Sequence, residues 1–85
     1  MTAVLLSSLR PGSRATVAQV LPPGDSHGRE LALRLIEIGF LPGEAVRVVA
    51  RGQPGDEPIA VRLGQTTFAL RRFEAALVAV DPGQP

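Results

Sequence analysis

Hydrophobic residues alternate with polar ones over several short stretches of the chain, which is the period expected of a half-buried β-strand. In one such stretch, Val46 and Val48 face one side, whereas Arg47, Val49 and Arg51 face the other. The same pattern predicts five strands in all, at 15–21, from residue 45 onward, at 59–63, around 68–70 and at 77–80.

A second period, with apolar residues three and four positions apart, predicts one main α-helix from about residue 26 to residue 38. Leu31, Leu35 and Ile38 recur at this spacing, with Ala32 and Ile36 beside them. We therefore expect one apolar face on this helix.

Both ends of the predicted helix carry recognisable signals. Asp25 or Ser26 can cap the N-terminus, because a side-chain oxygen there accepts a hydrogen bond from an unpaired backbone N–H. Gly39 suits the left-handed conformation that often ends a helix, and Phe40 can then fold back onto the last turn. A separate short helical turn is expected within 71–77.

The loop after the helix contains more apolar surface than a turn requires. Pro42 and Gly43 supply the tight turn, which leaves Phe40 and Leu41 as an apolar rim. Leu33 falls beside the buried stripe of the helix and is expected to be partly exposed. Packing against the apolar N-terminal segment is the alternative to a docking patch. The predicted partner-binding residues of this region are Leu33, Gly39, Phe40, Leu41, Pro42 and Gly43.

Five short strands and tight turns in an 85-residue chain predict a small, strongly bent antiparallel barrel with the helix over one end. This size indicates one domain with a single core over residues 1–85, and we expect 81–85 to be a frayed tail. The chain has no cysteine, so packing rather than disulfides or thiolate metal sites must stabilise it.

Charge is nearly balanced, because nine basic residues, all arginine, face eight acidic ones and give a net charge of +1. Such a balance does not produce the strong positive field typical of nucleic-acid-binding proteins. Aromatic stacking platforms are also scarce, since packing can explain each of the three phenylalanines. A strip of Arg47, Arg51 and Arg62 on the outer sheet face keeps a nucleic-acid-binding barrel as the alternative function, although nucleic acid is the less favoured partner.

Residues that could carry catalysis are few. His27 lies near Asp25 and Glu30, but ordinary helix capping is the favoured interpretation. Asp56 and Glu57 fall in the most polar loop, where carboxylates are usually solvated. Without cysteine, tyrosine or a second histidine, no nucleophile can be paired with a base, and no glycine-rich phosphate loop is present. We therefore expect no enzyme, no cofactor and no small-molecule substrate.

The beginning of the chain has an apolar run only at residues 3–6, with no basic residue before it. This run is too short for a signal peptide or a membrane span. We expect a cytoplasmic protein, which a membrane partner could hold at the inner membrane.

Several segments occur in an order and at a spacing that resemble the FeoA family, whose members are small cytoplasmic components of bacterial ferrous-iron uptake. Each segment is weak evidence alone, but together they are fairly specific. They are the Leu-x-x-Leu-x-Pro-Gly opening at 6–12, the RLIEIG helix end at 34–39 with LPG at 41–43, the alternation of Val46 and Val48, and the ALRR and EA elements within 69–75.

The resemblance implies an SH3-like barrel with helical insertions, which agrees with the architecture expected from periodicity. It also implies a partner, the FeoB ferrous-iron transporter, whose cytosolic portion is a GTP-binding domain. The chain is then a non-enzymatic accessory or regulatory protein. GTPase activation in trans often uses an exposed arginine, and Arg34, Arg71 and Arg72 are the candidates, but binding is favoured over activation. Arg71 and Arg72 are also predicted partner-binding residues.

Two further alternatives concern metal ions and self-association. Direct binding of ferrous ion, a transition metal, would require His27 and nearby carboxylates to converge, and we assign no metal ligands. The open edge of the barrel could pair with a second copy of the chain. A free-standing chain of this size without a DNA-binding helix pair argues against a metal-dependent repressor, in which a related SH3-like domain also occurs.

Overall fold

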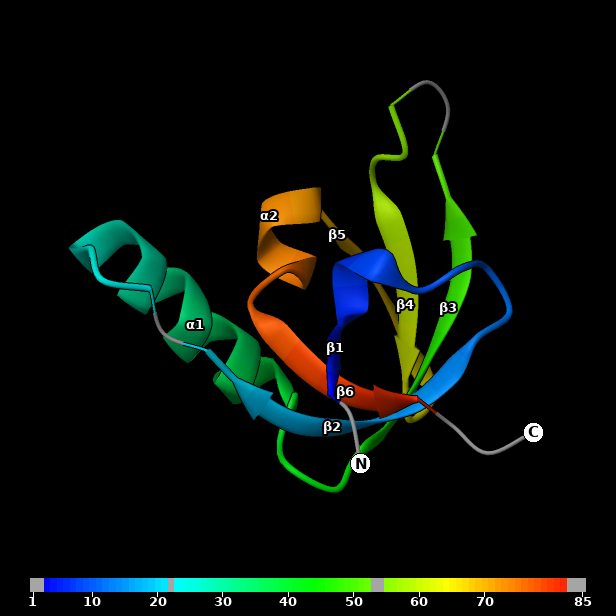
Figure 1. Ribbon diagram of the computed structural model, residues 1–85, viewed down its shortest axis with the longest axis horizontal. Coiled ribbons are helices and arrows are strands. Elements are labelled where there is room, and N and C mark those ends of the chain that lie inside the picture. The colour runs from blue at the N-terminus through cyan, green and yellow to red at the C-terminus, as the bar shows by residue number, and fades with distance from the viewer. Residues whose placement is uncertain (1–2, 22, 53–54, 83–85) are drawn as a thin grey trace.

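The computed structural model describes residues 3–21, 23–52 and 55–82, which form a strongly bent antiparallel sheet with one long helix at its side (Figure 1). The six strands follow the order β1-β6-β2-β3-β4-β5, so β1 and β5 are the edges. The elements are β1 (Val4–Leu5), the 3₁₀ turn η1 (Leu6–Ser8), β2 (Arg14–Val20), α1 (Ser26–Ile38), β3 (Ala45–Arg51), β4 (Ile59–Leu63), β5 (Thr66–Leu70), α2 (Arg72–Ala75) and β6 (Val78–Pro82).

The apolar residues that alternate along the strands fill the interior of the barrel. Val17, Val48 and Val61 come from three neighbouring strands and are almost fully buried. Leu6 closes the core from the N-terminal turn. The described segments bury no polar or charged residue, so apolar packing supplies the stability. The five predicted strands, the bent antiparallel barrel and the short helical turn are confirmed.

The structure adds one strand and corrects the end of another. The apolar run at the beginning of the chain forms β1, where Val4 pairs with Val80 of β6. The prediction that 81–85 is a frayed tail is wrong for Asp81 and Pro82, because these residues pair with Thr16 and Ala15 of β2. Residues 83–85 lie outside the described segments.

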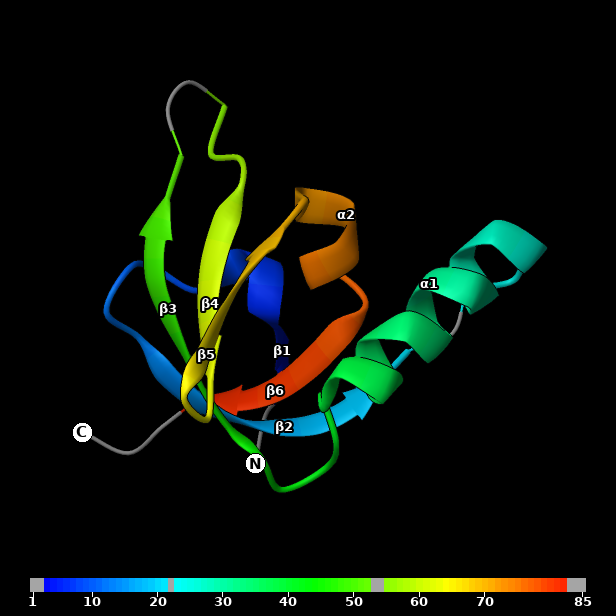
Figure 2. The same ribbon diagram turned by 180° about the vertical axis from the view of Figure 1, so that it is seen from behind.

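Helix α1 occupies the predicted span 26–38 and begins at the predicted cap. Asp25 is the N-cap, since Gly28 N–H donates to Asp25 Oδ1 at 2.6 Å. Only Gly28, Ala32 and Leu35 are buried, which is a narrow stripe for a helix of this length. Figures 1 and 2 show the N-terminal half of α1 projecting away from the sheet. The prediction that α1 covers one end of the barrel therefore holds only for its C-terminal part.

The helix ends at Gly39, whose φ of 129° lies in the region that favours glycine. Phe40 N–H donates to Leu35 O at 3.1 Å, and the Phe40 side chain turns into the core. It is 0% exposed and packs against Phe68, with ring centroids 6.2 Å apart. The expected fold-back of Phe40 is confirmed, but its interpretation as an exposed rim is wrong, because the cap directs the ring inward.

A β-bulge in β3 changes the side of the sheet that Arg51 faces. Val48 pairs with Val61 and Ala50 with Ala60, so Val49 is an extra residue in the ladder. The alternation inverts after it, and Arg51 lies opposite the buried Ile59. The prediction that Arg51 shares the outer face with Arg47 is therefore wrong.

Arg51 instead holds the N-terminal segment against the barrel. Its guanidinium donates to Leu9 O at 2.7 Å and to Ser7 O at 3.0 Å. The side chain is 15% exposed and also lies 3.7 Å from a carboxylate oxygen of Asp56. Hydrogen bonds from a charged donor in a half-buried place contribute more than neutral surface ones.

Replacing Phe40 by alanine should lower the free energy of unfolding by about 3–5 kcal/mol, because a fully buried ring is lost from the core. Leu41→Ala, one residue later in the chain but exposed, should change it by about 0.5 kcal/mol or less. Urea denaturation of both variants measures the difference. Equal losses would contradict the assignment of Phe40 to the core and Leu41 to the surface.

Arg51→Met should free the N-terminal segment while leaving the remainder of the barrel folded, with a loss of about 1–3 kcal/mol from the two charged hydrogen bonds. Hydrogen exchange should then accelerate at residues 5–9 and stay nearly unchanged in β4 and β5. Arg62→Met, an exposed arginine on the outer face, is the matched control. If both variants leave exchange at residues 5–9 unaltered, Arg51 does not hold this segment.

Candidate functional site

An apolar groove runs between the end of β2 and helix α1. Leu33 is 60% exposed and Ile36 is 39% exposed, which are high values for large apolar side chains at neighbouring positions of one helix. The groove has a volume of about 300 Å³ and is lined by Val20, Arg29, Ala32, Leu33 and Ile36. Exposed apolar surface of this kind is typical of a docking site.

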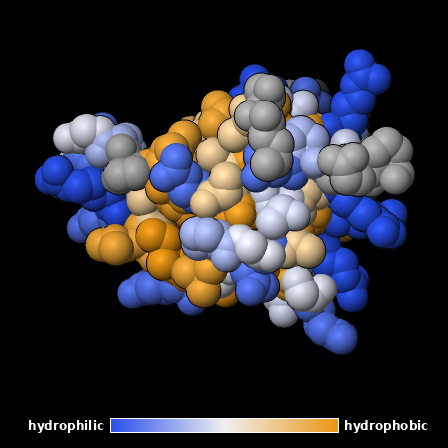
Figure 3. Space-filling model, turned by 60° about the horizontal axis from the view of Figure 1, so that its bottom comes forward, coloured by the Kyte–Doolittle hydropathy of each residue, from blue (hydrophilic) through white to orange (hydrophobic). Residues whose placement is uncertain are grey.

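This groove exists because α1 leaves the barrel before its whole apolar face is covered. Leu35 is buried, and Ile38 packs against the core next to it. Ile36 points to the other edge of the buried stripe and stays exposed, although the sequence pattern placed it with the apolar face. Figure 3 shows the resulting apolar surface around α1 and its junction with the sheet. We refer to Leu33, Ile36 and Leu41 as the helix patch, in which Leu33 and Ile36 line this groove and Leu41 lines a separate hollow together with Ile38 and Phe68.

The loop that follows α1 is fixed to the barrel by its backbone. Gly43 N–H donates to Val17 O at 2.8 Å, and Glu44 N–H donates to Leu41 O at 3.0 Å. Gly43 has a φ of 95°, as the predicted Pro-Gly turn requires. Leu41, at the tip before Pro42, is 44% exposed. Leu33 and Leu41 therefore remain exposed, as the docking patch requires, and the N-terminal segment does not cover them.

The two arginines predicted with this surface lie elsewhere. Figure 1 places α2 at the opposite end of the barrel from the loop after α1. There, Arg72 N–H donates to Glu57 Oε2 at 2.6 Å, and the Arg72 guanidinium lies 3.3 Å from Gly55 O and 3.5 Å from a carboxylate oxygen of Asp56. Arg71 precedes the helix, and its N–H donates to Glu74 Oε1. Arg71 and Arg72 therefore do not form one continuous surface with the helix patch.

The residues considered for metal binding are only partly brought together. His27 and Glu30 line one shallow depression on α1 together with Leu31, Arg34 and Glu37. Asp25 is engaged as the helix cap. In the described segments, no group of three or more histidine, cysteine, aspartate or glutamate side chains is arranged to hold a metal ion. The convergence required for a direct ferrous-ion site is therefore not found there.

The basic strip on the outer sheet face consists of other arginines than the sequence predicted. Arg47 and Arg62 are directly opposite each other on β3 and β4, as their alternation suggested. Arg51 is excluded by the bulge, and Arg14 of β2 takes its place because it pairs with Arg47. The sequence pattern missed Arg14, since the predicted strand began one residue later.

Helix α1 is too short to cross a membrane. Its 13 residues are the longest helical run in the described segments, and none of the helices there is long and apolar enough to cross a bilayer.

Solved structures of FeoA proteins resemble this chain in both sequence and fold. FeoA from Stenotrophomonas maltophilia, solved with zinc, is 44% identical over 92% of this chain and 89% of its own, with a TM-score of 0.82. It is described as an SH3 domain protein proposed to act as a bacterial ferrous iron transport activating factor. FeoA from Chlorobium tepidum is 30% identical over 95% of this chain and 71% of its own, with a TM-score of 0.74.

More distant structures share the fold alone. A manganese-dependent transcriptional repressor is 23% identical over 95% of this chain and 42% of its own, with a TM-score of 0.77.

No curated protein sequence matches the chain. The family model described as the FeoA domain matches residues 4–82. With its SH3-like barrel and this match over nearly its whole length, the chain belongs to the FeoA family.

Proposed function

We propose that this chain is a non-enzymatic accessory protein of bacterial ferrous-iron uptake, acting in the cytoplasm by binding the cytosolic part of a FeoB-type transporter. Membership of the FeoA family supports the pathway. The description of the Stenotrophomonas maltophilia relative as a candidate transport activating factor supports an accessory role. The helix patch is the surface that we assign to the transporter.

One observation carries this assignment: α1 projects from the barrel and presents large apolar side chains beside a groove (Figure 3). Fully burying a leucine or isoleucine side chain contributes about 1.5–3 kcal/mol. Three such side chains, already held on a capped helix and a hydrogen-bonded loop, lose little conformational freedom on binding. Because these side chains are already partly buried, they supply only part of the binding free energy, and the surrounding surface must supply the remainder.

The groove also indicates the chemistry of the partner surface. Four of its five lining residues are apolar, and the fifth is Arg29, at the edge of the stripe. A partner surface that matches this groove would insert an apolar side chain among the apolar lining residues and place a carboxylate beside Arg29. Gly39 and Gly43 then serve as positioning residues that set the direction of the loop, rather than as contacts.

Binding is favoured over GTPase activation by an arginine inserted into the transporter. An arginine finger must be free to enter the nucleotide site of the partner. The Arg72 guanidinium lies 3.3 Å from Gly55 O and 3.5 Å from an Asp56 carboxylate oxygen in the hairpin loop, so it is already engaged there. Arg34 lies within helix α1, not on a loop that could carry its side chain into the nucleotide site of the partner.

Leu33→Glu should weaken binding to the cytosolic GTP-binding domain of the cognate transporter by at least about tenfold, since it places a charge in the apolar contact. Calorimetric titration measures the affinity, with GDP and with a non-hydrolysable GTP analogue, and with and without ferrous ion. The thermal midpoint should stay nearly unchanged because Leu33 is exposed.

Ser26→Glu is the matched control, because it adds the same charge to the same helix at an exposed position outside the groove. It should bind like the unmodified protein. Equal weakening by both substitutions would mean that charge, rather than the helix patch, determines binding. Absence of binding by the unmodified protein in every nucleotide state would contradict the proposed partner domain.

A further inference from the structure

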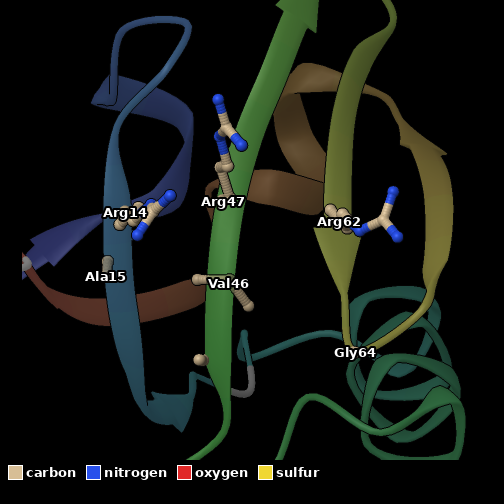
Figure 4. Close-up of a pocket in the computed structure, with 7 residues that line it drawn as sticks. Arg14, Ala15, Val46, Arg47, Arg62 and Gly64 are labelled. Atoms are coloured by element: carbon tan, nitrogen blue, oxygen red, sulfur yellow. The ribbon is translucent and has the colours of Figure 1, made fainter.

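Three arginines form a row across the outer face of the barrel. Arg14 of β2 pairs with Arg47 of β3, and Arg47 pairs with Arg62 of β4. All three are exposed. Neighbouring strands lie about 4.8 Å apart, so the row is about 10 Å long and runs perpendicular to the strands. Figure 4 shows the three side chains on adjacent strands, with the Arg14 guanidinium turned toward β3.

This arrangement costs stability in the free protein. Like charges directly opposite each other on neighbouring strands are destabilising, and Arg47 has such a neighbour on both sides. Within the described segments, no carboxylate lies within ion-pair distance of Arg14, Arg47 or Arg62, whereas Arg51 and Arg72 both lie near Asp56. The row is therefore uncompensated by the fold around it.

A hollow in the sheet surface lies among these side chains. Its volume is about 290 Å³, and its lining residues are Arg14, Ala15, Ala45, Val46, Arg47, Arg62 and Gly64. Ala45 and Gly64 are small, so another backbone can approach the sheet closely there. Ala15 and Val46 are buried in the core, so Ala45 and Gly64 are the exposed residues between the arginines. Three guanidinium groups spread over about 10 Å suit an extended polyanionic element better than a small isolated anion.

We propose that this arginine row binds an acidic helical segment of a partner protein that lies across β2, β3 and β4. On a helix, carboxylates at positions i, i+4 and i+8 are spaced by about 5–6 Å, which is close to the spacing of the strands. Three successive glutamates or aspartates could then each meet one arginine. Guanidinium groups form bidentate hydrogen bonds with carboxylates, which adds geometric specificity to the charge attraction.

Nucleic acid fits this surface less well. Binding of single strands relies on aromatic side chains on which bases stack. Here Phe40 is buried, Phe68 is partly buried against it, and Phe73 lies on α2 rather than on the row. The net charge of +1 also gives little long-range attraction for a polyanion.

The binding test uses a labelled alanine- and glutamine-based helical peptide with glutamates at three successive i, i+4 positions, measured by fluorescence anisotropy at low ionic strength. A peptide with glutamine at those positions should not bind. Arg47→Gln should weaken binding about tenfold, because the central guanidinium is lost. Arg34→Gln, which removes the same charge from helix α1, should change it by about twofold or less. Loss of binding in both variants, or no binding at all, would overturn the proposal.

A random RNA oligonucleotide distinguishes the other class of partner. If it binds more tightly than the acidic peptide, with a steep salt dependence that Arg47→Gln reduces, the row is a nucleic-acid surface and the proposal is wrong. Weak RNA binding that Arg47→Gln leaves unchanged supports the acidic helix.

The stability of the free protein provides an independent readout. Arg47→Gln should raise the thermal midpoint by about 2–5 °C at low salt, because it removes two like-charge neighbours. The increase should shrink at high salt, where the repulsion is screened. A fall in the midpoint would mean that Arg47 makes stabilising contacts in the free protein. The charges of the row would then be compensated without an anionic partner, and the proposal would be overturned.

Discussion

The direction of the chain at Gly39 is the constraint on which the rest of the structure depends. The positive φ of Gly39 ends helix α1 and directs the next residue, Phe40, into the barrel, where its ring packs against Phe68. A residue with a Cβ would be strained in this conformation and would also approach Leu63 closely. Since the helix is anchored at this end, its other end can leave the barrel and keep an apolar face exposed.

Backbone geometry, rather than hydrophobicity, therefore decides which of two adjacent residues is buried and which is exposed. Phe40 and Leu41 are both large and apolar, but the first belongs to the core and the second to the surface. The bulge at Val49 has the same effect in β3, where it moves Arg51 inward to the N-terminal segment and leaves Arg47 outside. Two separate surfaces result, one apolar beside α1 and one basic across the strands.

Much of the fold could be predicted from the sequence because alternation, helical spacing and caps are local signals. The helix limits, the turn after Gly39 and the five longer strands follow from such signals. The two-residue β1 could not be predicted, since only its pairing with β6 defines it. The position of Arg51 depends on a bulge that no residue type marks. The role of Arg14 emerges only once the register of β2 and β3 is known.

If α1 and the loop after it form the surface that binds the transporter, the cytosolic GTP-binding domain of the cognate transporter should protect these residues from hydrogen exchange. Exchange measured with and without that domain should slow in the C-terminal turns of α1 and in residues 39–44, with β4 and β5 unchanged. A complex that protects only another face, such as α2 and the β3–β4 hairpin, would contradict this assignment.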